Sequence, residues 1–213
     1  GMCSLEPGLC HIYHKKFDDW TNDRLLEYIA EPTDDRLYAI AQLIRGGVDL
    51  VLIYNRTKID MFFLEKFKNI VEFERVVEAA PMDIEVLREA KRMGFSDKFI
   101  GQLWGVSQHD MYLLREKNGI FPVYKMIDTC ASEFSSYVPY FYSTYEDENE
   151  SLVSDKEKIV VLGSGPIRIG QGVEFDYSTV HAIWSIREAG YEAIIINNNP
   201  ETVSTDYTTS DKL

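Results

Sequence analysis

The pattern of apolar residues changes near residue 150, and this change limits the fold more than any other feature. Before it, apolar residues recur at helical spacing between residues that cap helices. After it, short runs of branched apolar residues alternate with glycine-rich and helical stretches. A segment whose apolar residues recur at helical spacing does not form a regular strand, so we predict two domains, over residues 1–150 and 151–213. The chain has 213 residues, 45% of them hydrophobic, which is enough for two small cores.

The first domain is predicted to be all-α, with short helices and clear helix ends. One helix places apolar side chains on a single face and ends at Gly46-Gly47; its apolar residues are Leu37, Ile40, Ala41 and Ile44. Four further helices are predicted to begin at capping residues, namely Thr57, Asp83, Ser96 and Ser107. The first of these continues toward Pro81, and the other three end at Gly94, Gly105 and Gly119. Large apolar groups on the short helices are candidate anchors of an interface or parts of the core: Phe99, Trp104 and Tyr112.

Residues 94–115 resemble a helix-turn-helix of the DNA-binding type. A recognition helix needs cations for phosphate groups, whereas this one carries Asp110 and Glu116 beside Arg115. The formal net charge of −13 also argues against nucleic acid as a partner. We therefore interpret this stretch as a helical hairpin used for packing.

Residues 120–157 are rich in aromatic side chains but have neither a helical nor an alternating period. We interpret them as an extended exit segment of the helical domain whose rings pack on neighbouring surfaces. The other interpretation, a stacking platform for bases, would require interleaved Lys and Arg. The acidic run that begins at Glu146 is predicted to start a solvated linker.

From Lys158 onward the pattern is that of a β-α-β unit. The runs 159–162 and 193–196 are typical of buried parallel strands, and residues 178–189 between them have a helical pattern that stops at Gly190. One such unit does not complete a doubly wound sheet, so we expect a truncated α/β Rossmann-like domain.

A glycine-rich loop, residues 163–172, follows the first of these strands. Glycines allow the backbone to approach an anion, and the next helix offers free N–H groups. The loop departs from the dinucleotide fingerprint because Arg168 replaces the third glycine. It is not a Walker A loop either, because no G-K-[ST] follows. The pattern indicates only an α/β crevice in which the loop backbone can approach a ligand closely. Its candidate residues are Gly163, Gly165, Arg168, Gly170, Gln171 and Gly172, with Asn199 after the second strand.

Acidic residues follow both strands. Glu174 and Asp176 come after the glycine loop, and Glu201 comes after Asn199-Pro200. Open α/β sheets bind ligands at the carboxyl ends of their strands, so these acids are candidates for function. The alternative is that helix dipoles alone favour acids at these positions, and the pattern leaves both open.

Cysteines and histidines do not form a recognisable metal pattern. The chain has three cysteines without a C-x-x-C pair, which excludes a disulfide scaffold and a zinc ribbon and favours a reducing, cytoplasmic compartment. The stretch Cys10-His11-Ile12-Tyr13-His14 lacks the second pair that zinc requires. No 18-residue apolar run or signal peptide is present, so no membrane partner is expected. Gly1-Met2 resembles a tag-cleavage scar, and we expect a piece of a longer protein.

Residues 161–177 and 199–207 form long, specific strings that closely resemble the large subunit of carbamoyl-phosphate synthase. Residues 122–134 and 142–146 also match this family, and the resemblance weakens only in the first 30 residues. The family has two homologous halves, each with a pre-ATP-grasp and an ATP-grasp domain, joined by a helical oligomerisation domain. Arg168, Gly172 and the string 201–207 resemble the second half. The resemblance thus implies an oligomerisation domain followed by the opening of the second half.

The family is an ATP-dependent carbon–nitrogen ligase of arginine and pyrimidine biosynthesis. It uses two ATP, bicarbonate and ammonia from glutamine to make carbamoyl phosphate. The resemblance implies ATP, Mg²⁺ or Mn²⁺, and K⁺ as cofactors of the parent, with the glutaminase small subunit and further large subunits as partners. It implies that Glu174 and Glu201 line the passage for carbamate. The ATP-grasp residues are expected beyond Leu213, so this chain alone is expected to hold no catalytic residue, metal or cofactor. A stand-alone helical interaction module is the alternative, but it would not need the strings after residue 158.

Overall fold

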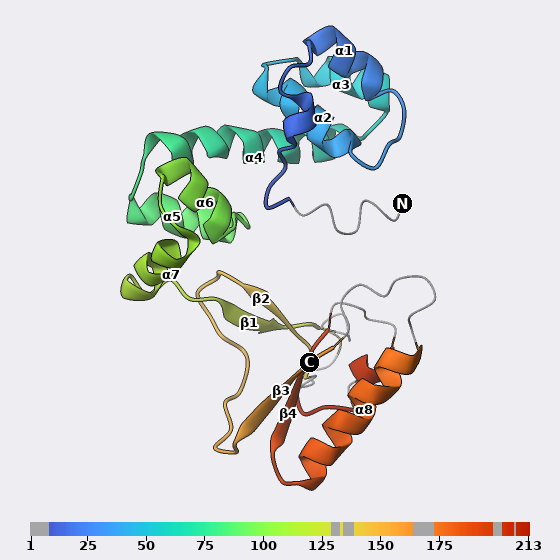
Figure 1. The fold of residues 1–213 in the computed structure, drawn as a ribbon, viewed down its shortest axis with the longest axis vertical. Helices are drawn as coiled ribbons and strands as arrows, with labels where there is room; N and C mark the ends of the chain where they lie inside the picture. Colours follow the sequence, from blue (N-terminus) through green and yellow to red (C-terminus); the bar gives the residue numbers. More distant parts are fainter. Residues whose placement is uncertain (1–8, 129–132, 134–138, 164–172, 198–201, 207) are drawn as a thin grey trace. The chain divides into compact units, whose positions relative to one another are not determined.

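The computed structural model describes residues 9–128, 133, 139–163, 173–197, 202–206 and 208–213, with side chains omitted at 173–175. The chain divides into two compact units, residues 1–121 and 122–213. Figure 1 shows helices in the first and a mixture of strands and helix in the second. The predicted fold class, an all-α domain followed by a truncated α/β β-α-β segment, is confirmed.

The described part of the first unit is entirely helical (Figure 1). Its elements are η2 (Lys15–Phe17), α1 (Asn22–Tyr28), α2 (Arg36–Arg45), α3 (Leu50–Thr57), α4 (Met61–Ala79), α5 (Ile84–Arg92), α6 (Asp97–Trp104) and α7 (Gln108–Lys117). Helix α2 lies at the centre of one core, where Ile40 and Leu43 are fully buried against Leu25 of α1 and Leu64 of α4. The predicted apolar face of α2 is therefore its buried face, except that Leu37 is exposed.

Three of the predicted helix starts are confirmed. The side chains of Asp83, Ser96 and Ser107 accept hydrogen bonds from first-turn N–H groups of α5, α6 and α7. The three predicted glycine exits follow these helices with positive φ, at Gly94, Gly105 and Gly119.

The predicted cap at Thr57 is wrong, because Thr57 is the last residue of α3. Its Oγ1 donates to Ile53 O at 2.8 Å, and Asp60 instead accepts from Phe62 N at 2.8 Å to begin α4. Thr and Asp are both good capping residues, and the sequence places them three positions apart. Helices α1 and α3 were not predicted.

A buried ionic cluster joins α5, α6 and α7. Asp97 receives hydrogen bonds from Arg115 Nη2 at 2.7 Å and from Lys91 Nζ at 2.8 Å. Burial alone would raise the pKa of Asp97, but these two cations outweigh burial and hold that pKa below its ordinary value. Arg115 also donates to Ile120 O at 3.0 Å, so its guanidinium binds Asp97 of α6 and the backbone that follows α7. The hairpin over residues 94–115 therefore serves packing. A Cβ at Gly101 of α6 would lie 2.6 Å from Val106 O in the connecting turn and 3.3 Å from Met111 Cγ of α7.

The described residues of the second unit contain two pairs of strands. Strand β1 (Val123–Met126) pairs antiparallel with β2 (Phe141–Thr144), and β3 (Lys158–Leu162) pairs parallel with β4 (Glu192–Ile196). Helix α8 (Val173–Glu188) connects β3 to β4, as the sequence predicts. A short 3-10 helix, η3 (Val203–Thr205), follows β4.

The structure places the unit boundary earlier than the sequence analysis did. Residues 122–150 were assigned to the helical domain, yet they pack in the second unit. Phe141 N in β2 donates to Leu213 O at 2.7 Å, and Ile195 N in β4 donates to Lys212 O at 2.9 Å. The acidic run that begins at Glu146 is exposed. Its last residue, Glu150, accepts a hydrogen bond from Met126 N of β1 at 2.6 Å. Such backbone pairing between distant residues leaves no mark in local composition.

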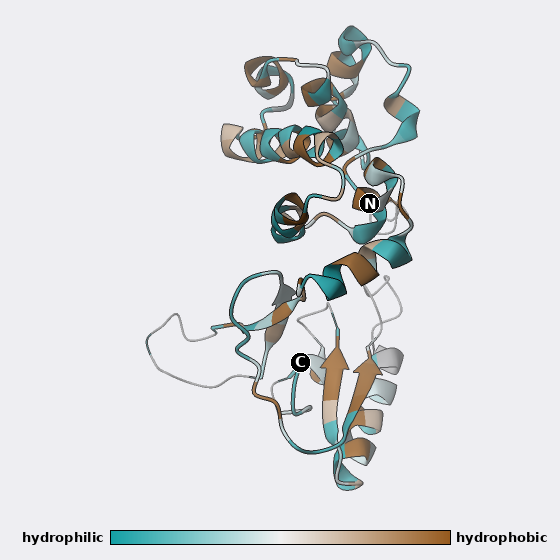
Figure 2. Ribbon diagram, turned by 90° about the vertical axis from the view of Figure 1, so that its left-hand side faces the viewer, coloured by the Kyte–Doolittle hydropathy of each residue, from teal (hydrophilic) through white to brown (hydrophobic). Residues whose placement is uncertain are grey.

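Helix α8 covers one face of the β3–β4 pair. Ile183 of α8 packs there with Ala193 and Ile195 of β4. Both strands are hydrophobic beyond their amino ends (Figure 2). On the face of the sheet opposite α8, Leu162 is 77% exposed and Ile196 is 59% exposed. This exposed apolar face agrees with the prediction that the α/β sheet is incomplete.

We predict that Asp97→Ala destabilises the chain by about 3–5 kcal/mol, because it leaves two buried cations without their carboxylate. Urea denaturation of the chain measures this loss. The matched control is Asp110→Ala on α7, an exposed carboxylate that accepts a hydrogen bond from Ser107 Oγ at 2.6 Å. The control should cost less than about 1 kcal/mol. Equal losses in the two variants would contradict the assigned role of the cluster.

Candidate functional site

The predicted site lies at the carboxyl ends of β3 and β4, where open α/β sheets bind ligands. Gly163 N donates to Ile196 O at 2.8 Å and extends the strand pairing by one residue. A Cβ atom at Gly163 would lie 3.0 Å from both Ile196 O and Asn197 Cβ. A side chain at this position would force these neighbours to shift by a few tenths of an ångström, so glycine allows the close contact between the ends of β3 and β4. The approach of the loop backbone to an anion stays a prediction.

Most of the other predicted site residues lie outside the described residues. This applies to Gly165, Arg168, Gly170, Gln171, Gly172, Asn199 and Glu201. Glu174 lies in the first turn of α8, but its side chain also lies outside the description. The described framework around them consists of Gly163, Asn197, the start of α8 and η3.

Asp176 is the carboxylate that the structure describes at this edge. It is 8% exposed, and its Oδ2 accepts from Val203 N at 2.8 Å and from Ser204 N at 3.2 Å. Its Oδ1 also accepts from Ser204 N at 3.2 Å. Asp176 is one of the acids that the sequence marks as candidates for function, but its partners were not predicted. Its bonding partners are backbone groups 27 and 28 residues away, which no sequence pattern marks.

Hydroxyl groups hold the turn after β4 in place. Thr202 and Thr205 form a capping box, in which Thr202 N donates to Thr205 Oγ1 at 3.2 Å. Thr209 Oγ1 donates to Val203 O at 2.9 Å, and Asn197 Nδ2 donates to Ser204 Oγ at 3.3 Å. Ser204 and Thr205 are almost completely buried. These polar groups form hydrogen bonds with one another and with the backbone, so they stabilise the conformation of the turn after β4.

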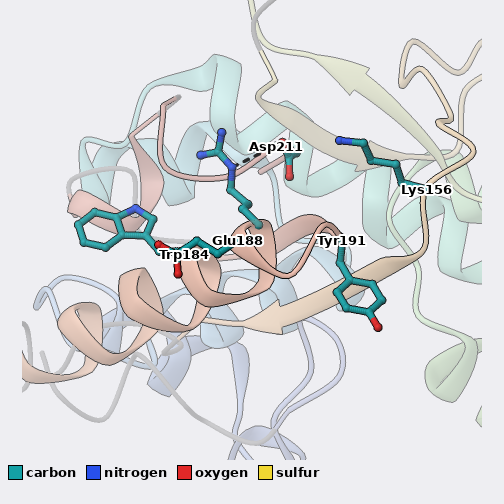
Figure 3. A pocket seen from close by; sticks show the side chains of 6 residues that line it. Lys156, Trp184, Glu188, Tyr191 and Asp211 are labelled. Atoms are coloured by element: carbon teal, nitrogen blue, oxygen red, sulfur yellow. Dashed lines mark ion pairs between the residues drawn. The ribbon is translucent and has the colours of Figure 1, made fainter.

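A separate hollow of about 460 Å³ lies at the other end of α8 (Figure 3). Arg187 lines it, but its Nη1 donates to the carbonyls of Thr208 and Thr209 at 3.0 and 2.9 Å, and its Nε lies 3.7 Å from Asp211. The lining residues are Lys156, Trp184, Arg187, Glu188, Tyr191 and Asp211. This hollow lies near the amino ends of the strands, so we assign no ligand to it.

The histidine at the start of the helical unit takes part in packing. His11 Nε2 lies 2.6 Å from Glu74 Oε1, and its ring stacks on Phe99 with a centroid distance of 3.8 Å. Arg45 also binds Glu74, through two hydrogen bonds of 2.7 and 2.8 Å. Burial raises the pKa of Glu74, but Arg45 and His11 reverse this and lower it below its ordinary value. Among the described residues, no cluster of three or more His, Cys, Asp or Glu side chains is placed to hold a metal ion.

The candidate interface anchors divide into half-buried and exposed groups. Trp104 donates its indole N–H to Val77 O at 2.6 Å, and Phe99 packs on His11, so both belong to the interior packing. Tyr112 is 47% exposed and remains a surface residue. Phe62 and Phe63 at the start of α4 belong to the apolar pattern of the predicted long helix, but they are 58% and 57% exposed, which was not predicted. Their helical spacing resembles that of core residues, so only burial distinguishes them.

The geometry defines an all-α unit followed by an open α/β unit whose described edge is a polar, hydrogen-bonded framework. Within the described residues, no helix is both long and apolar enough to cross a membrane. Residues 1–119 match the family described as carbamoyl-phosphate synthetase large chain, oligomerisation domain. Residues 155–213 match the carbamoyl phosphate synthase preATP-grasp domain. The chain therefore belongs to the carbamoyl-phosphate synthase large-chain family, and the resemblance found in the sequence is confirmed.

Proposed function

We propose that this chain joins the two halves of the large subunit of a glutamine-hydrolysing carbamoyl-phosphate synthase. The observation that carries the proposal is the order of the two matches, an oligomerisation domain over residues 1–119 followed in the same chain by a preATP-grasp domain over residues 155–213. The parent is proposed to act in the cytoplasm as an ATP-dependent ligase in arginine and pyrimidine biosynthesis. Its proposed cofactors are ATP, Mg²⁺ or Mn²⁺, and K⁺, and its proposed partner is a glutaminase small subunit.

The proposed reaction proceeds through an unstable intermediate. Bicarbonate is phosphorylated by the first ATP, and ammonia displaces the phosphate to give carbamate. The second half then phosphorylates carbamate to carbamoyl phosphate with the second ATP. Carbamate must travel between the two halves without loss to water, so an enclosed passage favours the overall reaction.

We propose that the second unit forms part of this passage, with Glu174 and Glu201 among its lining residues. Glu174 follows β3 in the sequence and Glu201 follows β4, and these strands are parallel neighbours. Two carboxylates on the route of a small anion must be positioned carefully, because like charges repel. The alternative is that both acids only stabilise helix ends.

Variants of the proposed passage are expected to separate the half-reactions of the complete synthase. Glu201→Lys places bulk and a cation on the route of carbamate. Carbamoyl-phosphate formation should fall by about tenfold or more, while bicarbonate-dependent ATP hydrolysis persists. ATP synthesis from added carbamoyl phosphate, run by the second half, should change less. Measurement of these three activities and the melting temperature for Glu174→Ala, Glu201→Ala and Glu201→Lys tests the passage, and unchanged coupling in all three would refute it.

We also propose that the helical unit associates with a second copy of the large chain. Exposed apolar side chains on α3 and at the start of α4 support this, namely Val51, Leu52, Phe62 and Phe63. Phe62 and Phe63 contact each other edge to face at 5.4 Å, which presents a compact aromatic surface.

Replacement of Phe62 and Phe63 by serine should weaken self-association of the synthase by about tenfold or more, as expected for aromatic anchors of an interface. Light scattering over a concentration series measures the shift. The matched control is Val76→Ser, an apolar residue of the same helix that is 45% exposed. A double variant that associates like the parent protein would argue against this surface.

The chain of 213 residues is expected to neither hydrolyse ATP nor make carbamoyl phosphate by itself. The two matched families are an oligomerisation domain and a preATP-grasp domain, and neither is the ATP-grasp domain to which the resemblance assigns nucleotide binding. A phosphate-release assay on the purified chain measures this. Steady turnover that rises with the concentration of the chain would contradict the expectation.

A further inference from the structure

Asp176 uses its carboxylate to hold a turn that lies far away in the sequence. Both of its oxygens accept hydrogen bonds from the backbone of η3, at 2.8 Å from Val203 N and at 3.2 Å from Ser204 N. The side chain is buried, and Ser204 has no exposed surface. Hydrogen bonds from N–H groups to a carboxylate are stronger than those between neutral groups, so this contact is a firm link between α8 and η3.

The link does more than complete the hydrogen bonding of a short helix. The capping box between Thr202 and Thr205 already closes η3 within its own residues. Thr209 fixes the carbonyl of Val203 from the following turn. Asp176 adds the attachment of this turn to α8, the helix that follows the loop after β3.

The two linked elements lie close in the sequence to the proposed passage acids. Glu174 precedes Asp176 by two residues in α8, and Glu201 precedes Val203 by two residues. A single buried carboxylate therefore joins the segment after β3 to the segment after β4, each within two residues of one acid.

We propose that Asp176 is a positioning residue: it fixes η3, which begins two residues after Glu201, against α8, the helix that contains Glu174. This proposal rests on the proposed passage. Asp176 itself has its oxygens engaged by backbone N–H groups, so it acts through the placement of its neighbours. A small displacement of one passage acid relative to the other would allow carbamate to escape or block its route.

The test compares Asp176→Ala with Asp176→Asn and with a matched control in the complete synthase. Asp176→Asn keeps the size of the side chain and one acceptor oxygen, so it retains the fold and weakens the link. The control is Asp211→Asn, because Asp211 Oδ2 likewise accepts a backbone hydrogen bond, from Ala193 N at 2.8 Å. That contact lies near the amino end of β4, away from the proposed passage.

The first measurement is hydrogen exchange of the peptide that contains Val203 and Ser204. Loss of the carboxylate should accelerate exchange of these two amides about tenfold in Asp176→Ala, with a smaller increase in Asp176→Asn. Asp211→Asn should leave this peptide unchanged. Unchanged exchange in Asp176→Ala would overturn the proposal.

The second measurement is the yield of carbamoyl phosphate per ATP hydrolysed, a ratio that a general loss of stability does not move. The yield should fall at least threefold in Asp176→Ala and less in Asp176→Asn, about twofold, while ATP synthesis from carbamoyl phosphate is retained. Asp211→Asn should keep the parental yield. If Glu201→Lys lowers the yield but Asp176→Ala does not, the positioning role is overturned and the passage stands. If Glu201→Lys also keeps the parental yield, the passage fails and the positioning role fails with it.

Discussion

The parallel pairing of β3 with β4 is the constraint on which the second unit depends. It places Leu162 opposite Ile196 and brings the segments after both strands to one edge of the sheet. Gly163 then continues the pairing, where a larger residue would collide with Asn197. Asp176 closes the arrangement by binding the turn after β4. The edge is thus built from strand pairing, one close glycine and one buried carboxylate.

Sequence reasoning succeeded where local chemistry determines the structure. Ser96 and Ser107 begin helices because their hydroxyl groups accept first-turn N–H groups, and Gly105 and Gly119 end helices because they adopt positive φ. The β-α-β unit was predictable because buried parallel strands need continuous apolar runs.

The remaining features depend on contacts that span long distances in the sequence. β1 and β2 were missed because their pairing with each other and with Leu213 has no local signature. Thr57 and Asp60 were confused because either side chain can cap a helix. The link formed by Asp176 was invisible because its partners are backbone N–H groups, which every residue other than proline provides. Phe99 and Phe62 look alike in the sequence, yet Phe99 is half-buried against His11 and Phe62 is 58% exposed.

The most direct test of this account is the distance between positions 174 and 201 within the chain. Glu174→Cys and Glu201→Cys can carry spin labels once Cys3, Cys10 and Cys130 are replaced by serine. A dipolar distance measurement should give one short, narrow distribution that broadens when Asp176→Ala is added. A broad distribution in the parent background, or a narrow one that Asp176→Ala does not alter, would contradict the claim that strand pairing and Asp176 together hold these two acids at one edge.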